Sequence, residues 1–466
     1  METHRSHRAS APAPEPAPEP VLEVNGGKRL SGSVRTSGFK HSLVTTAAAA
    51  AAARATVTID NCPDIVETEV LSRLFRTLGG SADLADGTLT LDASSLGGSE
   101  LPAELVGMIH GSMYLLPGLV ARAGSVRMPA SGGCPIGEGP HGRPVGHILS
   151  VMERFGAVGR VAPDGAIEVT ATALTGCTID LLDYTRNRAM MSGPLYGGAT
   201  KTALLTGAVA QGTTTLHHLY PKPDVTDLIA ALRDLGAELE HTGPETLVIH
   251  GRGAGALRQD VRRTLIPDLI EVVTWICAAV TLGDSPVHIA GPEMLRAVEA
   301  LRPEFDLFDR MGVRVDIGED GLTAHPAEGP LRPVEFTAAS RGVFSDSQPF
   351  LALMAAYAQG PTTITEGVWE HRFGYVPGLA ALGMRTTQDG HVLRVDGPCP
   401  PATAGLDLHA TDLRAAAALL LAALAVPGTT VLRNHQHLDR GYRDITGDLR
   451  TLGADIRRTT LAPRPH

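Results

Sequence analysis

A helix that ends at a glycine recurs six times along this chain of 466 residues. Each copy has an apolar run with helical spacing, such as Leu228, Leu232 and Leu235, then the glycine and a strand-like stretch. Glycine ends a helix at low cost because it accepts a left-handed backbone conformation. The six glycines, which lie roughly 70 to 80 residues apart, are Gly79, Gly156, Gly236, Gly312, Gly383 and Gly453. We therefore expect six repeats of one unit built from helices and strands.

The length of the chain predicts two domains of three units each, because 466 residues are too many for one ordinary core. Residues 1–21 are rich in proline and are expected to form a disordered tail. The first domain is expected to comprise residues 40–263, and the second residues 22–39 together with residues 264–466. In this division the N-terminal strand, residues 22–34, pairs with the last units and brings the ends of the chain together.

The composition excludes several classes of protein. A net charge of −10 argues against a nucleic-acid binder, although clustered arginines can still hold a small anion. Five cysteines without CxxC spacing indicate a reducing cytosol, with neither a disulfide framework nor a zinc site. The histidines form no metal-binding motif, and the alanine run Ala47–Ala53 is too short to span a bilayer and is read as a buried helix. We therefore expect a cytoplasmic protein that needs no metal, membrane or obligate protein partner.

Cationic side chains stand where expected strands end or expected helices begin. They are Lys40, Arg143, Arg372, Arg414 and Arg440. Arginine binds carboxylate and phosphate oxygens two at a time, and helix N-termini add N–H donors. Together these residues predict a site for a doubly anionic ligand. The alternative is a local ion pair at each position, Asp412 with Arg414 and Asp439 with Arg440.

Two further residues are candidates for chemistry. Cys134 lies in a glycine-rich loop near cations, which favour the thiolate and make it a candidate reactive cysteine. Asp346 precedes an apolar helix and could act as a general base for a hydroxyl. The alternative is that Ser345 or Asp346 simply caps that helix.

These phrases resemble the enolpyruvyl transferases, most closely the carboxyvinyltransferases that act on UDP-N-acetylglucosamine. The resemblance covers about residues 22 to 455 and rests on residues 132–137, 143–145, 370–373, 410–415 and 439–442. It implies an α/β fold, the inside-out α/β barrel, with two domains of three βαβαββ units each. It also implies transfer of the enolpyruvyl group of phosphoenolpyruvate to a hydroxyl of a uridine nucleotide, with release of phosphate and without a cofactor.

The same resemblance gives each motif residue an expected role. Lys40, Arg143 and Arg440 would hold the phosphate of phosphoenolpyruvate, while Arg372 and Arg414 would clamp its carboxylate. Cys134 would act as proton donor or covalent trap, and Asp346 would receive the proton of the acceptor. The remaining expected substrate-binding residues are His41, His110, Asp412, Pro144 and Val145.

The sequence departs from the family where the acceptor is expected to bind. His41 stands in place of an asparagine, His110 in place of an arginine, and Gly146 in place of an acid. Such changes alter specificity and favour UMP or a related nucleotide in specialised metabolism such as nucleoside antibiotic synthesis, with Arg186 and Arg188 on its terminal phosphate. The alternatives are UDP-N-acetylglucosamine in peptidoglycan synthesis, the shikimate-pathway acceptor, and a non-catalytic nucleotide-binding regulatory paralogue.

Overall fold

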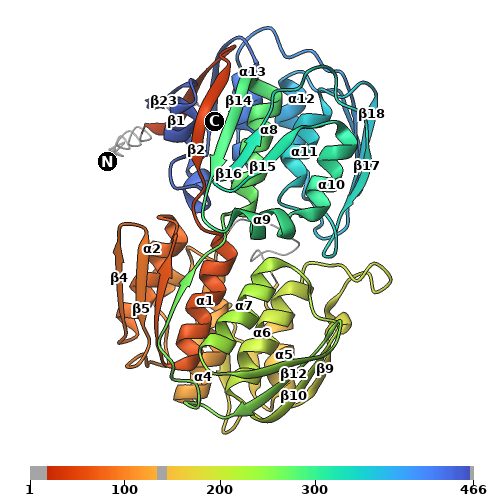
Figure 1. Cartoon of the computed structure of the whole chain (residues 1–466). Coiled ribbons are helices and arrows are strands. Elements are labelled where there is room, and N and C mark those ends of the chain that lie inside the picture. The colour runs from red at the N-terminus through yellow and green to blue at the C-terminus, as the bar shows by residue number, and fades with distance from the viewer. Residues whose placement is uncertain (1–17, 134–143, 462–466) are drawn as a thin grey trace, which may run out of the picture.

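The structure is a computed structural model that describes residues 18–133 and 144–461. These residues form two lobes, one below the other in Figure 1. The lower or first lobe has a core of buried apolar side chains that runs from Leu43 to Leu265. The core of the second lobe combines Leu22 to Phe39 with Ile266 to Ile456. The two cores support the domain borders near residues 40 and 264, which we retain as a proposal.

The described residues form six small sheets, three in each lobe, which correspond to the six expected units. Each four-stranded sheet has one parallel pair followed by two antiparallel pairs. In pairing order, the first lobe contains β13 (Val261–Thr264), β3 (Thr56–Asp60), β5 (Thr88–Asp92) and β4 (Ser81–Ala85); β6 (Ser125–Met128), β8 (Ile167–Thr170) and β7 (Val158–Val161); and β11 (Glu238–Gly243), β12 (Thr246–Arg252), β10 (Gln211–His217) and β9 (Thr178–Asp180). The second lobe contains β15 (Val315–Gly318), β16 (Gly321–Ala324), β14 (Gly283–Ala290) and β2 (Leu30–Arg35); β17 (Glu335–Ala338), β18 (Pro361–Glu366), β20 (Val392–Asp396) and β19 (Thr386–Asp389); and β21 (Asp407–His409), β22 (Gly428–Arg433), β1 (Glu19–Gly26) and β23 (Asp455–Leu461).

One helix from each unit lies at the centre of its lobe. These inner helices are α1 (Lys40–Ala53), α4 (Leu116–Ala123) and α6 (Tyr196–Val209) in the first lobe, and α8 (Leu269–Leu282), α11 (Gln348–Ala355) and α13 (Leu413–Ala425) in the second. Within each lobe the three inner helices contact one another. Their sequences are apolar on every side, as expected for a helix surrounded by protein. Ala47–Ala53 belongs to α1 and is buried, as the sequence predicted.

The glycine-ended helices lie nearer the surface and have one buried face. They are α2 (Val66–Thr77), α5 (Gly146–Arg154), α7 (Pro223–Asp234), α10 (Arg302–Met311), α12 (Val376–Ala381) and α14 (Ile445–Thr451). The shorter elements are α3 (Ala103–Val106), α9 (Met294–Ala300) and the 3₁₀ helices η1 (Gly111–Leu115), η2 (Leu181–Tyr184) and η3 (His435–Arg440). All six predicted glycines have positive φ, between 83° at Gly312 and 109° at Gly383 and Gly453. The repeat of helix ends read from the sequence is therefore confirmed.

Substituting Gly118 tests how tightly the inner helices pack. A Cβ at this position of α4 would lie 2.7 Å from the backbone nitrogen of Ala52 in α1, and backbone atoms cannot rotate away. We expect Gly118→Ala to lower the free energy of unfolding by about 1–3 kcal/mol. Gly146→Ala in α5 is the matched control, because nothing lies within 4 Å of its added Cβ. Denaturant unfolding that shows equal stability for both variants would contradict this packing.

The chain crosses between the lobes twice, and the two crossing segments lie next to each other. Gly38 and Pro267 form an antiparallel bridge, and the amide of Asp268 donates to the carbonyl of Ser37 at 2.7 Å. The Asp268 carboxylate caps α8 and also accepts from the backbone N–H of Lys40 at 3.1 Å. One side chain therefore holds the first turns of α1 and α8 together, and this positions Lys40 at the junction of the lobes.

The N-terminal segment is divided between two sheets. β1 lies between β22 and β23, which confirms the expected pairing with the last unit. β2 pairs instead in parallel with β14 of the fourth unit, so the expectation of one continuous strand is wrong. In the part of the chain that the structure describes, no helix combines the length and apolar character needed to cross a membrane.

Candidate functional site

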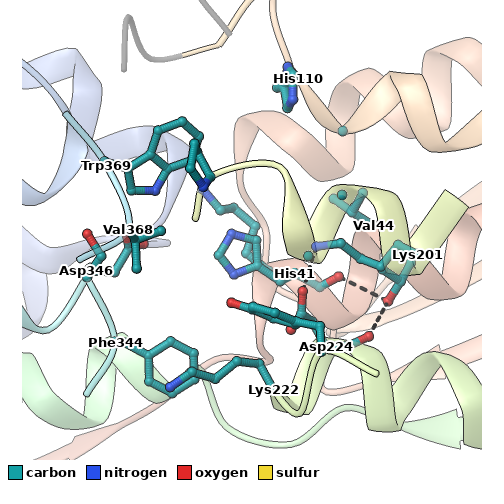
Figure 2. Close-up of a pocket in the computed structure, with 18 of the residues that line it drawn as sticks. His41, Val44, His110, Lys201, Lys222, Asp224, Phe344, Asp346, Val368 and Trp369 are labelled. Atoms are coloured by element: carbon teal, nitrogen blue, oxygen red, sulfur yellow. Dashed lines mark hydrogen bonds and ion pairs between the residues drawn. The ribbon is translucent and has the colours of Figure 1, made fainter. Parts of the chain in front are cut away.

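A cavity of about 210 Å³ lies between the lobes and is lined by side chains from both. Figure 2 shows His41 and Lys201 of the first lobe facing the same space as Asp346 and Trp369 of the second. The cavity brings together most of the residues predicted from the sequence, namely Lys40, His41, His110, Pro144, Asp346, Arg372, Asp412, Arg414 and Arg440. Motifs that lie hundreds of residues apart therefore converge on one site.

Arg372 and Arg414 hold Asp346 between them. Nη2 of Arg372 lies 2.7 Å from Oδ1 of Asp346, and Nε of Arg414 lies 3.1 Å from Oδ2. Both arginines are almost completely buried, at 4% and 1% exposure. Burial alone would raise the pKa of Asp346, but the fields of Arg414 and Arg372 outweigh it and hold the pKa well below its usual range. Asp346 is therefore ionised.

Each of the two buried guanidinium groups has an N–H donor that is not used within the described residues. Nη2 of Arg414 and Nε of Arg372 have no hydrogen-bond partner among the described residues. Because buried donors are normally satisfied, such groups in a cavity indicate a place for acceptor oxygens of a ligand. The two arginines can therefore hold a carboxylate in addition to Asp346 or in exchange for it.

The simpler alternatives for the acidic residues are wrong. α11 begins at Gln348 after Ser347, and neither Ser345 nor Asp346 caps it; Ser345 donates instead to Glu366 at 2.8 Å. Asp439 pairs with Arg458 rather than with Arg440.

Asp412 combines two contacts. It caps α13 by accepting from the backbone N–H of Arg414 at 2.9 Å, and it accepts from Nη1 of Arg372 at 3.3 Å. It therefore orients the first turn of α13 and one of the two arginines. No local pair with the Arg414 guanidinium is seen among the described contacts, so that alternative is wrong as well.

Lys40 and Arg440 meet across the lobes at one carboxylate. Oε1 of Glu67, in the first turn of α2, lies 3.7 Å from Nζ of Lys40 and 3.0 Å from Nη2 of Arg440. Lys40 is the first residue of α1, and Arg440 is the last residue of η3. This contact joins the lobes at the edge of the cavity and places two positive charges beside it.

The two histidines at altered family positions occupy different environments. Burial and the neighbouring Lys40 lower the pKa of His41 to about 3, so its ring is neutral. The ring packs edge-on against that of Phe39, with 5.1 Å between the two ring centres. Nδ1 of His110 lies 3.3 Å from Oγ of Ser131. A Cβ on Gly133 would lie 3.1 Å from Cβ of His110 and 3.8 Å from Nη2 of Arg440, so the chain reaches the cavity there.

Several predicted residues are not placed in the cavity. Cys134 and Arg143 lie outside the described residues, and their roles stay predictions. Val145 precedes α5 and packs on the first core, and it is absent from the cavity lining, unlike its neighbour Pro144.

The structure gives no support for Arg186 and Arg188 as phosphate ligands. Arg186 pairs with Glu370 across the lobes, and Arg188 pairs with Asp180 at 2.7 Å and Asp183 at 2.9 Å. Neither lines the cavity. Both arginines are paired with carboxylates outside the cavity lining, and their expected role stays a prediction.

A polar group on the first-lobe side of the cavity was not predicted from the sequence. Lys201 in α6 pairs with Asp224 in α7 at 2.6 Å, and both are buried. Tyr114, Tyr220 and Lys222 line the cavity nearby, as do Glu67 and His147. One signal could have revealed Lys201: a charged residue within an otherwise small and apolar helix is costly unless it serves a purpose.

Comparison with known proteins agrees with this geometry. A family model described as EPSP synthase (3-phosphoshikimate 1-carboxyvinyltransferase) matches residues 24–449. The UDP-N-acetylglucosamine 1-carboxyvinyltransferase of a Nitratiruptor species is 32% identical over 439 residues, which are 94% of this chain and 99% of the relative. The enzyme of the same name from Dichelobacter nodosus is 34% identical over 440 residues, which are 94% of this chain and 98% of the relative.

Solved structures show the same architecture. The enolpyruvyl transferase NikO from Streptomyces tendae is 66% identical and superposes with a TM-score of 0.91, covering 96% of this chain and 100% of that structure. EPSP synthase from Acinetobacter baumannii is 16% identical with a TM-score of 0.70, covering 94% and 100%, a likeness of fold alone. The predicted two-domain α/β fold is confirmed.

Proposed function

Because the chain belongs to the enolpyruvyl transferase family, the family of EPSP synthase, we propose that it moves the enolpyruvyl group of phosphoenolpyruvate to a hydroxyl of a uridine nucleotide and releases phosphate. The observation that carries this proposal is the convergence of Lys40, Arg372, Arg414 and Arg440 on one cavity from both lobes. Phosphoenolpyruvate carries a carboxylate and a phosphate on one small carbon frame, and buried arginines and lysines match such a ligand.

The reaction requires a proton at one carbon and a hydroxyl at the next. Protonation of the methylene carbon makes the adjacent carbon cation-like, and the acceptor oxygen then forms a bond to it. The C–O bond to phosphate breaks, and loss of a proton from the new methyl group restores the double bond. Fixed cations in a closed cavity stabilise the charge that develops on the departing phosphate. We assign the carboxylate contacts to Arg372 and Arg414 and the phosphate contacts to Lys40 and Arg440.

Asp346 is our candidate for the acceptor of the hydroxyl proton. Its two oxygens are bound by Arg372 and Arg414 in this structure. A carboxylate of phosphoenolpyruvate that takes over those donors would relieve Asp346 of its strongest cationic contacts and raise its proton affinity. The base would then be strongest when the first substrate is in place.

UMP, or a related uridine nucleotide, is the acceptor that we favour. Support comes from His41 and His110, which line the cavity at positions where relatives are expected to carry other residues. The 66% identity to the enolpyruvyl transferase NikO, about twice the identity to the UDP-N-acetylglucosamine enzymes, also supports a specialised role such as nucleoside antibiotic synthesis. UDP-N-acetylglucosamine is the second candidate, favoured by the curated relatives at 32% and 34% identity.

A phosphate-release assay with an acceptor panel tests these proposals. Purified enzyme is incubated with phosphoenolpyruvate and UMP, UDP-N-acetylglucosamine, shikimate 3-phosphate or no acceptor. Released phosphate is measured, and the mass of the acceptor is determined by mass spectrometry. We expect phosphate and an enolpyruvyl adduct with UMP. Activity with UDP-N-acetylglucosamine alone would establish the second candidate. Failure to release phosphate with either uridine nucleotide would overturn both candidates and favour a non-catalytic regulatory protein.

A further inference from the structure

Lys222 differs from the other cations of the cavity in having no carboxylate partner among the described residues. The remaining five each lie within 4 Å of a carboxylate: Lys40 and Arg440 at Glu67, Lys201 at Asp224, and Arg372 and Arg414 at Asp346. In residues 18–133 and 144–461, no Asp or Glu oxygen lies within that distance of the Lys222 ammonium. A buried ammonium without a counter-charge is costly, so its presence in a cavity points to an anionic ligand.

The contacts of Lys222 are neutral groups of the second lobe. Its side chain is 5% exposed at the start of α7, and its Nζ donates to the carbonyl of Gly342 and lies 3.6 Å from the ring centre of Phe344. Figure 2 shows the side chain extending to Phe344 along the cavity wall. Neither partner neutralises the charge.

Two carboxylates act on Lys222 from a distance. Oε1 of Glu304 in α10 accepts from the amide of Phe344 at 2.6 Å and from Oγ of Ser347 at 3.0 Å, while its buried Oε2 has no hydrogen-bond partner among the described residues. Asp224 is paired with Lys201. Burial lowers the pKa of Lys222 to about 8, against the opposing fields of Glu304 and Asp224. A dianion at this place would restore the full positive charge.

We propose that Lys222 binds the phosphate monoester of the nucleotide acceptor and thereby makes the enzyme prefer UMP to uridine. This inference rests on the proposed function. The charges of phosphoenolpyruvate are already matched by Lys40, Arg372, Arg414 and Arg440, which come from other elements. Lys222 lies instead near Tyr220 and the Lys201–Asp224 ion pair, whose two charges cancel, on the part of the first lobe that packs around α6 and α7.

The competing explanation is that Lys222 only fastens the lobes together through Gly342 and Phe344. The two explanations differ in their dependence on the substrate. A fastening contact affects every acceptor equally, whereas a phosphate contact affects only an acceptor that carries phosphate.

The test compares UMP with uridine in matched variants. Lys222→Met removes the charge and Lys222→Arg keeps it. Arg233→Gln is the control, because Arg233 is an exposed cation at the other end of α7 that donates to the carbonyl of Leu239. We expect Lys222→Met to lower kcat/KM for UMP by about 10- to 100-fold, the worth of a charged hydrogen bond, with kcat/KM for uridine and KM for phosphoenolpyruvate unchanged. Lys222→Arg should retain most of the preference, and Arg233→Gln should behave as the wild type.

The outcomes separate this inference from the function on which it rests. Equal losses with UMP and uridine would overturn the phosphate contact and leave the enzyme's function intact. A raised KM for phosphoenolpyruvate in Lys222→Met would assign the lysine to the other substrate and would overturn the inference too. A wild type that releases no phosphate with UMP overturns both proposals together.

A pH profile gives a second readout. Lys222 is protonated below its pKa of about 8 and neutral above it, whereas a nucleotide phosphate is already a dianion at neutral pH. KM for UMP should therefore rise as the pH passes through about 8 in the wild type and stay level in Lys222→Arg. An equal rise of KM with pH in Lys222→Arg would contradict the contact, because arginine stays charged throughout this range.

Discussion

Replacing Arg414 with methionine should lower kcat/KM for phosphoenolpyruvate on the order of 10³-fold. The guanidinium is 1% exposed, binds Asp346 through Nε and has a buried Nη2 that no described residue satisfies. Methionine keeps much of the volume and removes every donor, so the loss should appear in both KM and kcat. Arg414→Lys restores a charge without the planar fork and should recover only part of the activity.

Arg433→Met is the matched control for this experiment. Arg433 is as deeply buried, at 3% exposure, and is paired with Asp407 at 2.8 Å and with Glu19, but it lies in β22 outside the cavity. Both variants should lose stability in a thermal unfolding scan, because each leaves carboxylates without their partner. Only Arg414→Met should change KM for phosphoenolpyruvate. A folded Arg414→Met enzyme with nearly normal kinetics would refute the proposed carboxylate site.

Asp346→Asn is expected to separate binding from turnover. Loss of the proton acceptor should lower kcat by about 10²- to 10⁴-fold. The same change should tighten the binding of phosphoenolpyruvate by about tenfold, because a neutral amide competes less for Arg372 and Arg414 than the carboxylate that they now hold. Single-turnover kinetics and calorimetric titration measure the two effects separately.

The control for Asp346→Asn is Asp60→Asn, which removes another aspartate paired with an arginine, Arg262, at 2.7 Å on β3. It should leave both phosphoenolpyruvate affinity and kcat unchanged. The depressed pKa of Asp346 also stabilises the fold above the unfolded-state pKa, and this contribution is lost as the pH falls through the folded value. Weaker binding of phosphoenolpyruvate by Asp346→Asn would show that the carboxylate assists the ligand rather than competing with it.

The repeated fold could be predicted from the sequence because its signal is local. Gly236 and its five counterparts end helices for a reason that depends on one residue and its immediate neighbours. The convergence of Lys40, Arg372 and Arg414 could also be expected, since each stands in a motif of several residues. Their distances, and the way Asp346 lies between two arginines, depend on how the lobes meet and could not be read from the chain.

Features that depend on long-range contacts could not be read from the sequence. Arg186 and Arg188 looked available as phosphate ligands, but Glu370 of the other lobe and Asp180 of the same lobe fold against them. Lys222 escaped notice because it is a single lysine between two prolines. Its importance appears only when its ammonium group is seen to contact the Gly342 carbonyl and the Phe344 ring and no described carboxylate.

The position of β1 between β22 and β23 has a consequence for synthesis on the ribosome. The first lobe is built almost entirely from one continuous stretch of chain and can assemble while translation continues. In the second lobe, β1 has no pairing partner until β22 and β23 have been synthesised. We therefore expect the nascent protein to carry an exposed apolar strand, with Val21, Leu22 and Val24, for nearly the whole of elongation, and to need protection from aggregation mainly at that end.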